Sequence, residues 1–395
     1  MSQDSIVIVA ARRTPIGAFQ GALSRASAVQ LSATASRACL DDAGIDPAEV
    51  HEAIIGCVLP AGIGQAPARQ AALAAGLAQS VGCTTVNKVC GSGMRAAMLG
   101  HDVIRAGSAD VVLAGGMESM TNAPYLLPKA RDGYRMGHQK VIDHMFFDGL
   151  QDAYDQSMMG VFAENTAQRY GFSREQQDAF AIESVTRARA AISNGAFDAE
   201  TAAVVMANRK GETTVAEDEE PGRANVDRIP TLRPAFTKDG TVTAANASSI
   251  ADGAASLLLM RETEAARRGI QPLARIVGHA GHSHEPEWFT TAPVGAIRSL
   301  QEKIGWSPAD VDLYEINEAF ACVAMAAMHD LELDHAKVNV NGGACALGHP
   351  IGASGARVIV TLLHALQKRG GKRGIAALCI GGGEAVSMAL ELCGQ

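Results

Sequence analysis

The sequence of 395 residues predicts an α/β fold built from two similar halves. Its strands are continuous apolar runs that alternate with Ala-rich helical patterns, which is typical of parallel sheets covered by helices on both faces. The two ends of the chain carry the same order of features, and the middle does not. Hydrophobic residues make up 47% of the chain, so a large core is expected and disordered or fibrous structures are excluded.

The two ends of the chain match element by element. Each half begins with an apolar strand and a turn containing Thr, Pro, Gly and Ala. A helical segment, an acidic turn and a second strand follow, and each half closes with a buried strand that runs into glycines. The matching segments are residues 6–18 and 274–296, 50–56 and 311–317, and 111–116 and 376–383. Their offset of about 260 to 280 residues indicates a weak internal repeat.

The middle of the chain, from about residue 121 to 243, is richer in Met and charged residues. It includes a predicted helix over residues 173–194, with Ser173 as N-cap and Gln176 three residues on. We interpret this segment as an insertion. The predicted division is residues 1–121 for the N-terminal half, completed by about 244–272, then 122–243 for the inserted domain and 273–395 for the C-terminal half.

Charge and cysteine usage limit the expected partners. A net charge of -8 and only 4% aromatic residues offer neither attraction for polyanions nor a stacking platform, so nucleic acid is not expected. The eight Cys occur singly, with no Cys-x-x-Cys pair, no secretory segment and no membrane-spanning run. These features predict a soluble, cytoplasmic protein with reduced thiols and no membrane partner.

The first candidate for chemistry is Cys90, within residues 84–97. A β-type run stops at this Cys, Gly91 and Gly93 permit a tight turn, and a helical pattern begins. A thiol on such an elbow lies at a helix N-terminus, where thiolate and oxyanion are both stabilised. A buried structural Cys before a Gly turn is the open alternative.

The second candidate is His349, in the glycine-rich segment of residues 339–355. Pro350 restricts His349 to an extended conformation, so the segment presents an imidazole from a loop. No Gly-Lys-Ser/Thr ending and no Gly-x-Gly-x-x-Gly follow a strand here, so neither nucleotide-binding fingerprint is present. A histidine that caps a turn remains the alternative.

Two further candidates follow strands of the second half. Asn317 ends one predicted strand, and Cys379 ends another before glycines 381–383. Ligands of parallel α/β sheets bind beyond the carboxyl ends of the strands, so both residues are expected at one rim. Cys379 could exchange protons or belong to the core, and Asn317 could only fix a loop.

Together these segments resemble the thiolase family. The Cys-Gly-Ser-Gly elbow, Asn-Glu-Ala-Phe, the Gly-Gly-x-x-x-Leu-Gly-His-Pro-Ile-Gly-x-Ser-Gly loop and Cys-x-Gly-Gly-Gly occur in the order of that family. Further matches lie at residues 162–167, 233–236 and 240–248, and the resemblance covers essentially the whole chain. It implies the thiolase fold, five α-β-α-β-α layers from two similar halves, with an inserted loop domain for CoA binding and oligomerisation.

The resemblance also implies the catalytic roles. Cys90 would be the nucleophile that forms an acyl-enzyme, activated by His349, and Cys379 would exchange protons with the substrate. One oxyanion would bind the backbone N–H groups of Cys90 and Gly381, and the other His349 with a water held by Asn317. No metal and no cofactor are expected, because hydrogen-bond donors carry the charge and CoA is a substrate or product.

Substrate contacts are implied as well. Arg223 is the expected phosphate contact, and residues 134–154 resemble the loop with which thiolases form tetramers, so a homotetramer is expected. The pantetheine channel would be lined by Leu150, Phe236, Ala244, Ser248, Ala319 and Phe320.

The implied activity is that of an acyl-CoA C-acetyltransferase, with acetyl-CoA, acetoacetyl-CoA and CoA as its reactants. The alternative is a degradative thiolase for longer or branched chains. Met158 occupies the position where short-chain members usually have His, whereas Phe289 could cap a short acyl pocket. Ketoacyl synthases are disfavoured because they use a second His or Asn where this chain has Cys379. A metal pair at His282 and His284 is not expected, since a third spaced ligand is lacking.

Overall fold

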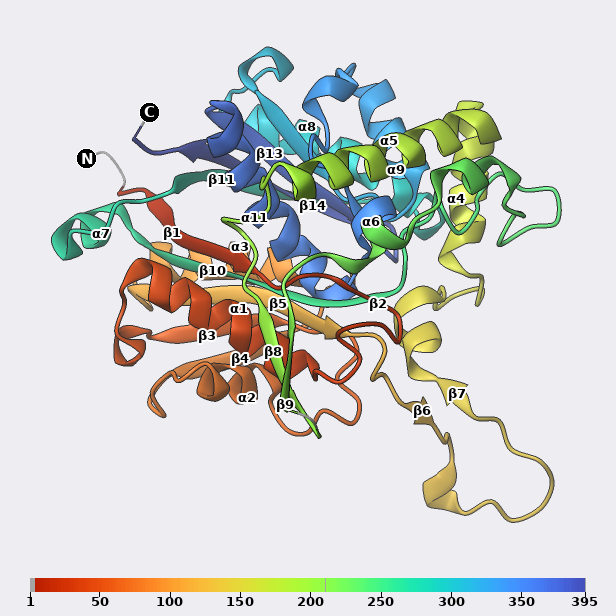
Figure 1. Ribbon diagram of the computed structural model, residues 1–395, viewed down its shortest axis with the longest axis horizontal. Helices are drawn as coiled ribbons and strands as arrows, with labels where there is room; N and C mark the ends of the chain where they lie inside the picture. The colour runs from red at the N-terminus through yellow and green to blue at the C-terminus, as the bar shows by residue number, and fades with distance from the viewer. Residues whose placement is uncertain (1–3, 210, 395) are drawn as a thin grey trace.

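A computed structural model of the chain describes residues 4–209 and 211–394. Within these residues one mixed sheet of ten strands organises the fold (Figure 1). Its strands are β1 (Ile6–Arg13), β2 (Gly17–Ala18), β3 (Glu52–Gly56), β4 (Gly82–Val86), β5 (Val111–Ser119), β10 (Ala251–Arg261), β11 (Ala274–Ser283), β12 (Leu313–Ile316), β13 (Arg373–Ile380) and β14 (Glu384–Leu392). Their order is β12-β13-β14-β11-β1-β10-β5-β3-β4, and β2 pairs with β10.

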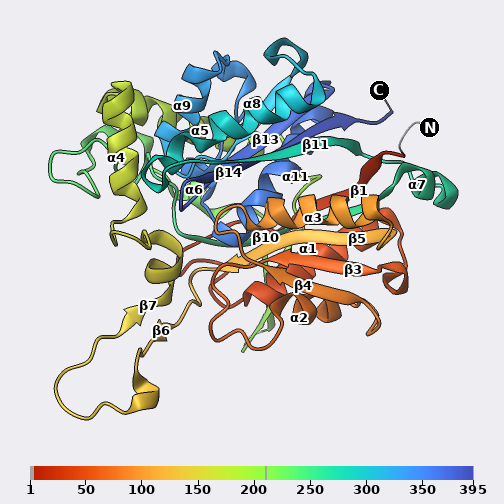
Figure 2. The same cartoon turned by 180° about the vertical axis from the view of Figure 1, so that it is seen from behind.

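The sheet divides into two half-sheets at the junction of β1 and β11, which share only two residue pairs. Figures 1 and 2 show the half-sheets stacked with α3 and α11 between them, α1 and α2 on one outer face, and α8 with α9 on the other. The predicted five-layered α-β-α-β-α architecture is therefore confirmed. The helices of these layers and their connections are α1 (Ala28–Ala43), α2 (Pro67–Ala74), α3 (Ser92–Ala106), α7 (Glu262–Arg268), α8 (Ala292–Ile304), α9 (Ala321–Asp330), α10 (Ala344–Leu347) and α11 (Ile351–Arg369).

The strand directions correct one expectation from the sequence. Only β3 with β4 and β5, and β12 with β13, run parallel, whereas β1, β10, β11 and β14 pair with their neighbours antiparallel. The apolar runs were interpreted as parallel strands because parallel sheets are covered on both faces. Here helices cover both faces of antiparallel strands too, so the runs report burial and not strand direction.

Residues 122–243 lie beside the layered core and partly extend from it. The strands β6 and β7 form an arm that projects from the molecule, and β8 and β9 form a separate hairpin (Figure 1). Helix α5 begins after Ser173, and Gln176 completes the predicted capping box. The domain boundaries given above stay a prediction. The elements of this segment are β6 (Tyr125–Leu126), β7 (Ile142–Asp143), α4 (Met159–Tyr170), α5 (Arg174–Ser193), β8 (Val204–Asn208), β9 (Gly211–Val215) and α6 (Glu219–Arg223).

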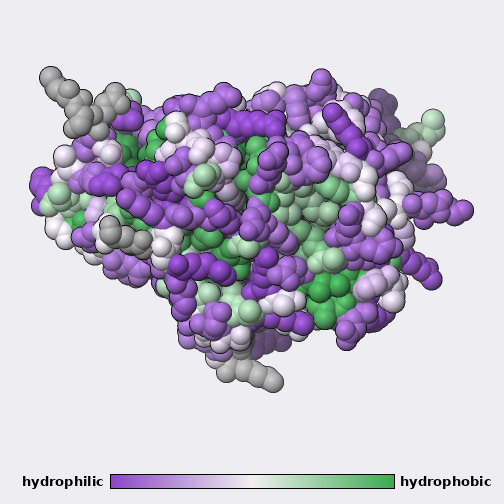
Figure 3. Space-filling view, turned by 90° about the horizontal axis from the view of Figure 1, so that it is seen from above, coloured by the Kyte–Doolittle hydropathy of each residue, from purple (hydrophilic) through white to green (hydrophobic). Residues whose placement is uncertain are grey.

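Single helical turns complete the secondary structure. A π-helical turn spans Phe146–Leu150, and 3-10 turns span Pro47–Glu49, Ala130–Asp132, Val226–Thr231, Pro286–Thr291, Pro308–Asp310 and His335–Lys337. None of the helices within the described residues is long and apolar enough to cross a membrane. The face in Figure 3 is mostly hydrophilic, with recessed apolar areas between the polar side chains.

The central helices α3 and α11 cross at glycine. A Cβ atom on Gly93 would lie 2.7 Å from the backbone nitrogen of Ala356, and one on Gly355 would lie 2.3 Å from that of Met94. Real Cβ atoms do not approach backbone so closely, so only glycine allows this crossing. The crossing brings the N-terminal ends of both helices together. Cys90 precedes α3 and His349 precedes α11, so the two candidate residues meet there.

Candidate active site

Cys90 stands on an elbow between β4 and α3. Val89, directly before it, has a φ angle of +45°, which is strained for a β-branched residue. The amide side chain of Asn87 accepts the N–H of Val89 at 2.9 Å. The hydroxyl of Ser92 accepts the N–H of Lys88 at 2.8 Å and donates to the carbonyl of Val89 at 2.7 Å. These hydrogen bonds hold the strand-to-helix elbow that the sequence predicts.

The environment of Cys90 favours the thiol over the thiolate. Burial raises its pKa to about 11, and the carboxylate of Glu118 raises it as well. Hydrogen bonds from the backbone N–H groups of Gly381 and of Cys90 itself oppose this shift. The thiolate stabilisation expected at the start of α3 is therefore outweighed by burial. Cys90 is protonated at neutral pH, and a base is needed to make it a nucleophile.

His349 is a buried imidazole with one free ring nitrogen. Its Nδ1 lies 2.6 Å from the hydroxyl of Ser354, which donates its own proton to the carbonyl of Pro350 at 3.1 Å. Nδ1 therefore carries the ring proton, and Nε2, which has no partner within residues 4–209 and 211–394, is the acceptor. Burial, with the charge of Arg357, lowers the pKa of His349 to about 3. The ring is neutral and can accept a proton.

Asn317 is held by a buried arginine. Arg357 on α11 donates from Nη1 to Glu315 at 2.6 Å and from Nη2 to Oδ1 of Asn317 at 3.1 Å. With its oxygen occupied, the Asn317 amide must direct Nδ2 the other way, and this buried donor has no partner among the described residues. Nδ2 of Asn317 could donate to a polarised oxygen or a water, whereas Nε2 of His349 could accept a proton from a thiol or a water.

Cys379 lies beneath the cavity and not in its wall. It is the second-last residue of β13, is completely buried, and packs in an apolar cluster with Phe162, Phe289 and Phe320. Burial raises its pKa well above the usual value, and the nearby sulfur of Cys90 raises it further. Cys379 is therefore protonated in the free protein. The structure brings the two predicted catalytic thiols together although they lie 289 positions apart in the sequence.

A cavity of about 360 Å³ opens at Cys90. Most of the predicted site residues line it, and the wall is largely apolar. The predicted lining residues are Cys90, Leu150, Met158, Phe236, Ala244, Ser248, Phe289, Ala319, Phe320, His349 and Gly381. The wall also contains residues that the sequence does not single out. They are Phe146, Gly149, Met159, Gly160, Ala235, Ala247, Ser249, Ile250 and Ile351. A channel for an apolar, extended group fits this wall.

Two positioning residues were missed. Ser354 fixes the tautomer of His349, and Arg357 fixes the amide of Asn317. Ser354 lies in the glycine-rich segment of residues 339–355, five residues after His349, so its contact with His349 could have been expected from the sequence. Arg357 gave none, because its contact with Asn317 joins segments 40 residues apart.

Arg223 is a predicted substrate contact that does not line the cavity. It lies on α6, where its exposed guanidinium pairs with Glu219 at 3.1 Å. The carboxylate of Glu219 also accepts the N–H groups of Ala18 and Ala22. The role of Arg223 as a phosphate contact stays a prediction.

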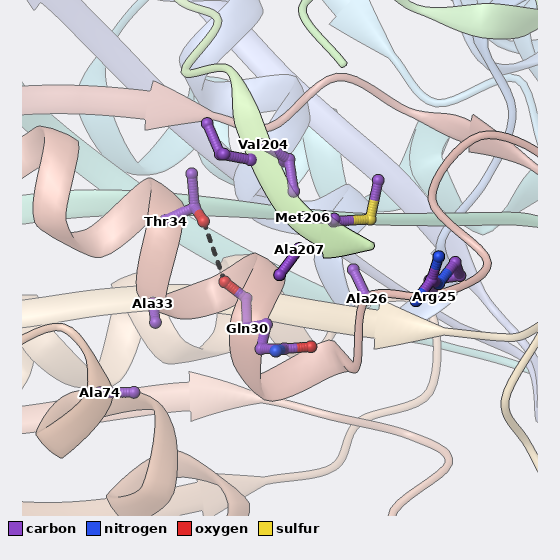
Figure 4. A pocket seen from close by; sticks show the side chains of 10 residues that line it. Arg25, Ala26, Gln30, Ala33, Thr34, Ala74, Val204, Met206 and Ala207 are labelled. Atoms are coloured by element: carbon purple, nitrogen blue, oxygen red, sulfur yellow. Dashed lines mark hydrogen bonds between the residues drawn. The ribbon is translucent and has the colours of Figure 1, made fainter. Parts of the chain in front are cut away.

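A second hollow lies between α1, α2 and β8 (Figure 4). Arg25 is the only ionisable side chain among the described residues that line it. The hydroxyl of Thr34 is engaged by the carbonyl of Gln30 at 3.0 Å within α1. No nucleophile faces a base there, so the candidate active site is the cavity at Cys90.

Comparisons with known proteins identify the family of the chain. The family model "Thiolase, N-terminal domain" matches residues 6–263, and "Thiolase, C-terminal domain" matches residues 270–392. An acetyl-CoA acetyltransferase of Rhizobium meliloti is 52% identical over 99% of this chain and 100% of its own length. An acetyl-CoA acetyltransferase of Chromobacterium violaceum is 51% identical over 98% of this chain and 99% of its own.

Solved structures give the same result. The acetyl-CoA acetyltransferase of Bacillus anthracis superimposes with a TM-score of 0.96 at 42% identity, covering 99% of both chains. The Acat5 thiolase of Ascaris suum, solved in complex with coenzyme A, has a TM-score of 0.93 at 40% identity over 98% of this chain and 100% of its own. Two matching family models, full-length relatives and the cavity at Cys90 together lead to one conclusion: the chain belongs to the thiolase family.

Proposed function

We propose that the chain is an acetyl-CoA C-acetyltransferase. It condenses two acetyl-CoA molecules to acetoacetyl-CoA and CoA, and the reverse reaction cleaves acetoacetyl-CoA with CoA. The observation that carries this proposal is a protonated thiol and a neutral imidazole in the wall of one apolar cavity, with a second protonated thiol buried next to the first. Full-length relatives that carry the name acetyl-CoA acetyltransferase support it.

The first half-reaction acylates Cys90. Nε2 of His349 takes the thiol proton, and the sulfur attacks the thioester carbonyl of acetyl-CoA. The N–H groups of Cys90 and Gly381, which already point at the sulfur, stabilise the oxyanion of the tetrahedral intermediate. When the C–S bond to CoA breaks, Cys379 donates its proton to the departing CoA thiolate and is left as a thiolate.

The second half-reaction forms the C–C bond. The Cys379 thiolate takes a proton from the α-carbon of a second acetyl-CoA, and burial makes this thiolate a strong base. His349, now protonated, and a water held by Nδ2 of Asn317 stabilise the enolate oxygen. The α-carbon attacks the acyl group on Cys90. The sulfur of Cys90 leaves and recovers its proton from His349, so the protons balance.

The wider setting belongs to the same proposal. The reaction uses CoA thioesters and needs neither a metal nor another cofactor, because N–H donors and imidazole carry each charge. The chain acts in the cytoplasm, in lipid metabolism. It forms a homotetramer through the arm that carries β6 and β7, where Leu127, Met136 and Val141 expose apolar side chains that a partner subunit would cover.

The position of Phe289 supports a short acyl chain as the substrate. Phe289 is buried against Phe162, with ring centroids 6.3 Å apart, and it closes one side of the cavity. Met158 and Met159 are flexible apolar neighbours, so slightly longer chains are still accommodated. A ketoacyl-CoA thiolase for longer chains is therefore the second candidate.

The direct test follows the absorbance of the acetoacetyl-CoA enolate as CoA is added. The proposal predicts loss of absorbance with the purified protein and none with the Cys90→Ala variant. A folded wild-type protein that leaves the absorbance unchanged contradicts the function. Cleavage of 3-ketooctanoyl-CoA with a higher kcat/KM than acetoacetyl-CoA favours the second candidate.

A further inference from the structure

Three metal-binding side chains meet where α3 approaches β11. Oδ1 of Asp102 lies 3.0 Å from Nδ1 of His101 and 3.0 Å from Nε2 of His279. The two ring nitrogens are 3.3 Å apart, and the rings meet edge to face. His101 is buried, His279 is partly buried and Asp102 is exposed to solvent. None of the three lines the cavity at Cys90.

The spacing of these atoms matches the ligands of a tetrahedral metal. Zn²⁺ binds imidazole nitrogen at about 2.0–2.1 Å and carboxylate oxygen at about 2.0–2.2 Å, so ligand atoms in a tetrahedron are about 3.3 Å apart. The three atoms here are 3.0 to 3.3 Å apart and form one face of such a tetrahedron. The fourth position lies toward solvent, because Asp102 has 48% of its side chain exposed. A water can complete the coordination.

We propose that His101, Asp102 and His279 form a binding site for one divalent transition metal ion, with Zn²⁺ as the best fit. Two imidazoles, one carboxylate and one water are a ligand set typical of this ion. The ion would replace the two N–H hydrogen bonds that Asp102 accepts from the rings. Each imidazole would move its proton from the ligating nitrogen to its other nitrogen, a change of tautomer that leaves the ring neutral and releases no net proton.

The charges around the cluster set its chemistry. Metal binding needs neutral imidazoles and an ionised carboxylate, and the cluster places two imidazole nitrogens and one carboxylate oxygen within 3.3 Å of one another. Arg105 and Lys303 are the nearby cations, and both disfavour further positive charge. The ion is therefore held by coordination bonds and not by long-range attraction.

A metal at this site would join the two halves of the fold. His101 and Asp102 belong to α3 of the first half, and His279 belongs to β11 of the second, 177 residues from Asp102. The three ligands are together only in the folded chain, so an ion that binds them stabilises the folded state. The role of the site is structural, and it is independent of the reaction proposed above.

The test uses the full-length protein with the Cys90→Ala substitution, which removes the reactive thiol as a competing ligand. After treatment with a chelator, Zn²⁺ is titrated by calorimetry and the melting temperature is measured with and without Zn²⁺. We expect one equivalent to bind and the melting temperature to rise. His279→Gln and Asp102→Asn are each expected to weaken Zn²⁺ binding at least about tenfold, since second-shell changes alone cost about 10–100-fold.

His282→Gln is the matched control, because His282 is a partly buried histidine on the same strand that lies outside the cluster. It is expected to bind Zn²⁺ like the parent. Asp102→Asn keeps the side-chain shape at an exposed position, so it reports on the site even if His279→Gln does not fold. Equal Zn²⁺ affinity in all variants overturns the proposal. A Co²⁺-loaded protein whose spectrum shows thiolate-to-cobalt charge transfer overturns it too, because the ion then lies on a cysteine.

Discussion

Two cysteines at one cavity show how surroundings divide roles between identical side chains. Cys90 stands on a strained elbow, reaches the cavity and receives two backbone N–H groups at its sulfur. Cys379 lies near the end of a strand, is completely buried among aromatic rings, and does not line the cavity. In the proposed mechanism Cys90 attacks the thioester and carries the acyl group, while the N–H groups stabilise the oxyanion. Cys379 only exchanges a proton, so the proposal derives the two roles from position and burial.

The largest expected effect comes from Cys90→Ala. Removing the thiol deletes the covalent step, so turnover should be abolished, while the small change in volume leaves the fold and CoA binding intact. Steady-state rates, circular dichroism and CoA titration measure the three properties. Residual turnover above about one thousandth of the wild-type rate would break the contrast between the cysteines, because another group would then carry the acyl chain.

Cys379→Ser should separate the two half-reactions. Acylation of Cys90 should persist, because the CoA thiolate can depart without receiving a proton from residue 379, whereas turnover should fall by about two to four orders of magnitude, the usual cost of a lost general acid or base. The serine hydroxyl fills nearly the same space as the thiol. It is a far weaker proton acceptor, because its alkoxide anion hardly forms. Single-turnover acylation and steady-state condensation are compared. An equal fall in both rates contradicts the assignment.

Asn317→Asp tests the enolate site with little change in shape. The carboxylate still accepts the hydrogen bond from Arg357 but lacks the Nδ2 donor. Loss of one oxyanion donor costs about 10²–10³ in rate, so condensation should fall by that factor while acylation of Cys90 changes much less. Condensation at the wild-type rate would mean that Asn317 only fixes its loop.

Much of this site follows from the sequence because glycine-rich turns leave a local signal. The turns at Cys90, His349 and Cys379 need small residues, and the glycines beside these three residues indicate the turns in the sequence. The contact of Arg357 with Asn317 and the sign of the pKa shift at Cys90 could not be predicted. Both arise from packing between segments that are distant in sequence. At Cys90, burial raises the pKa and outweighs the stabilisation of the thiolate that its place before a helix predicts.

The same limit applies to the fold. The capping box follows from local hydrogen bonds and the five layers from the family resemblance, and both predictions are confirmed. Strand direction cannot be predicted from the apolar pattern, because a strand covered on both faces is apolar whether it runs parallel or antiparallel to its neighbours. The cluster of His101 with His279 has no motif, since its members are 178 residues apart.

Phe289→Leu should widen the cavity on the side that Phe289 closes. One methylene in an apolar pocket changes kcat/KM by about 10–200-fold, so the ratio for C6 over C4 ketoacyl-CoA should rise about tenfold. The wild-type protein should show a graded preference, with C4 above C6 and C6 above C8. A steady rise toward C8 in the wild type would defeat the short-chain assignment. Phe146→Leu, elsewhere in the cavity wall, is the matched control.

The smallest effect is expected from moderate acid. His349 acts as a base only when neutral, and a free histidine would be protonated below its usual pKa of about 6.5. Because burial and Arg357 lower the pKa of His349 to about 3, the ring stays neutral throughout pH 5.5–8. Single-turnover acylation should therefore show no loss centred near pH 6.5 as the pH falls. A half-maximal rate near pH 6.5 would show that the ring is hydrated and exposed.

The central claim is that Cys90 carries the acyl group and Cys379 does not. Labelled acetyl-CoA is mixed with the wild-type protein, the reaction is quenched by denaturation in acid, and the labelled peptide is identified by mass spectrometry. The account predicts one acetyl group per chain, on Cys90, in both the wild type and Cys379→Ser. An acetyl group on Cys379, or on any residue other than Cys90, would contradict it.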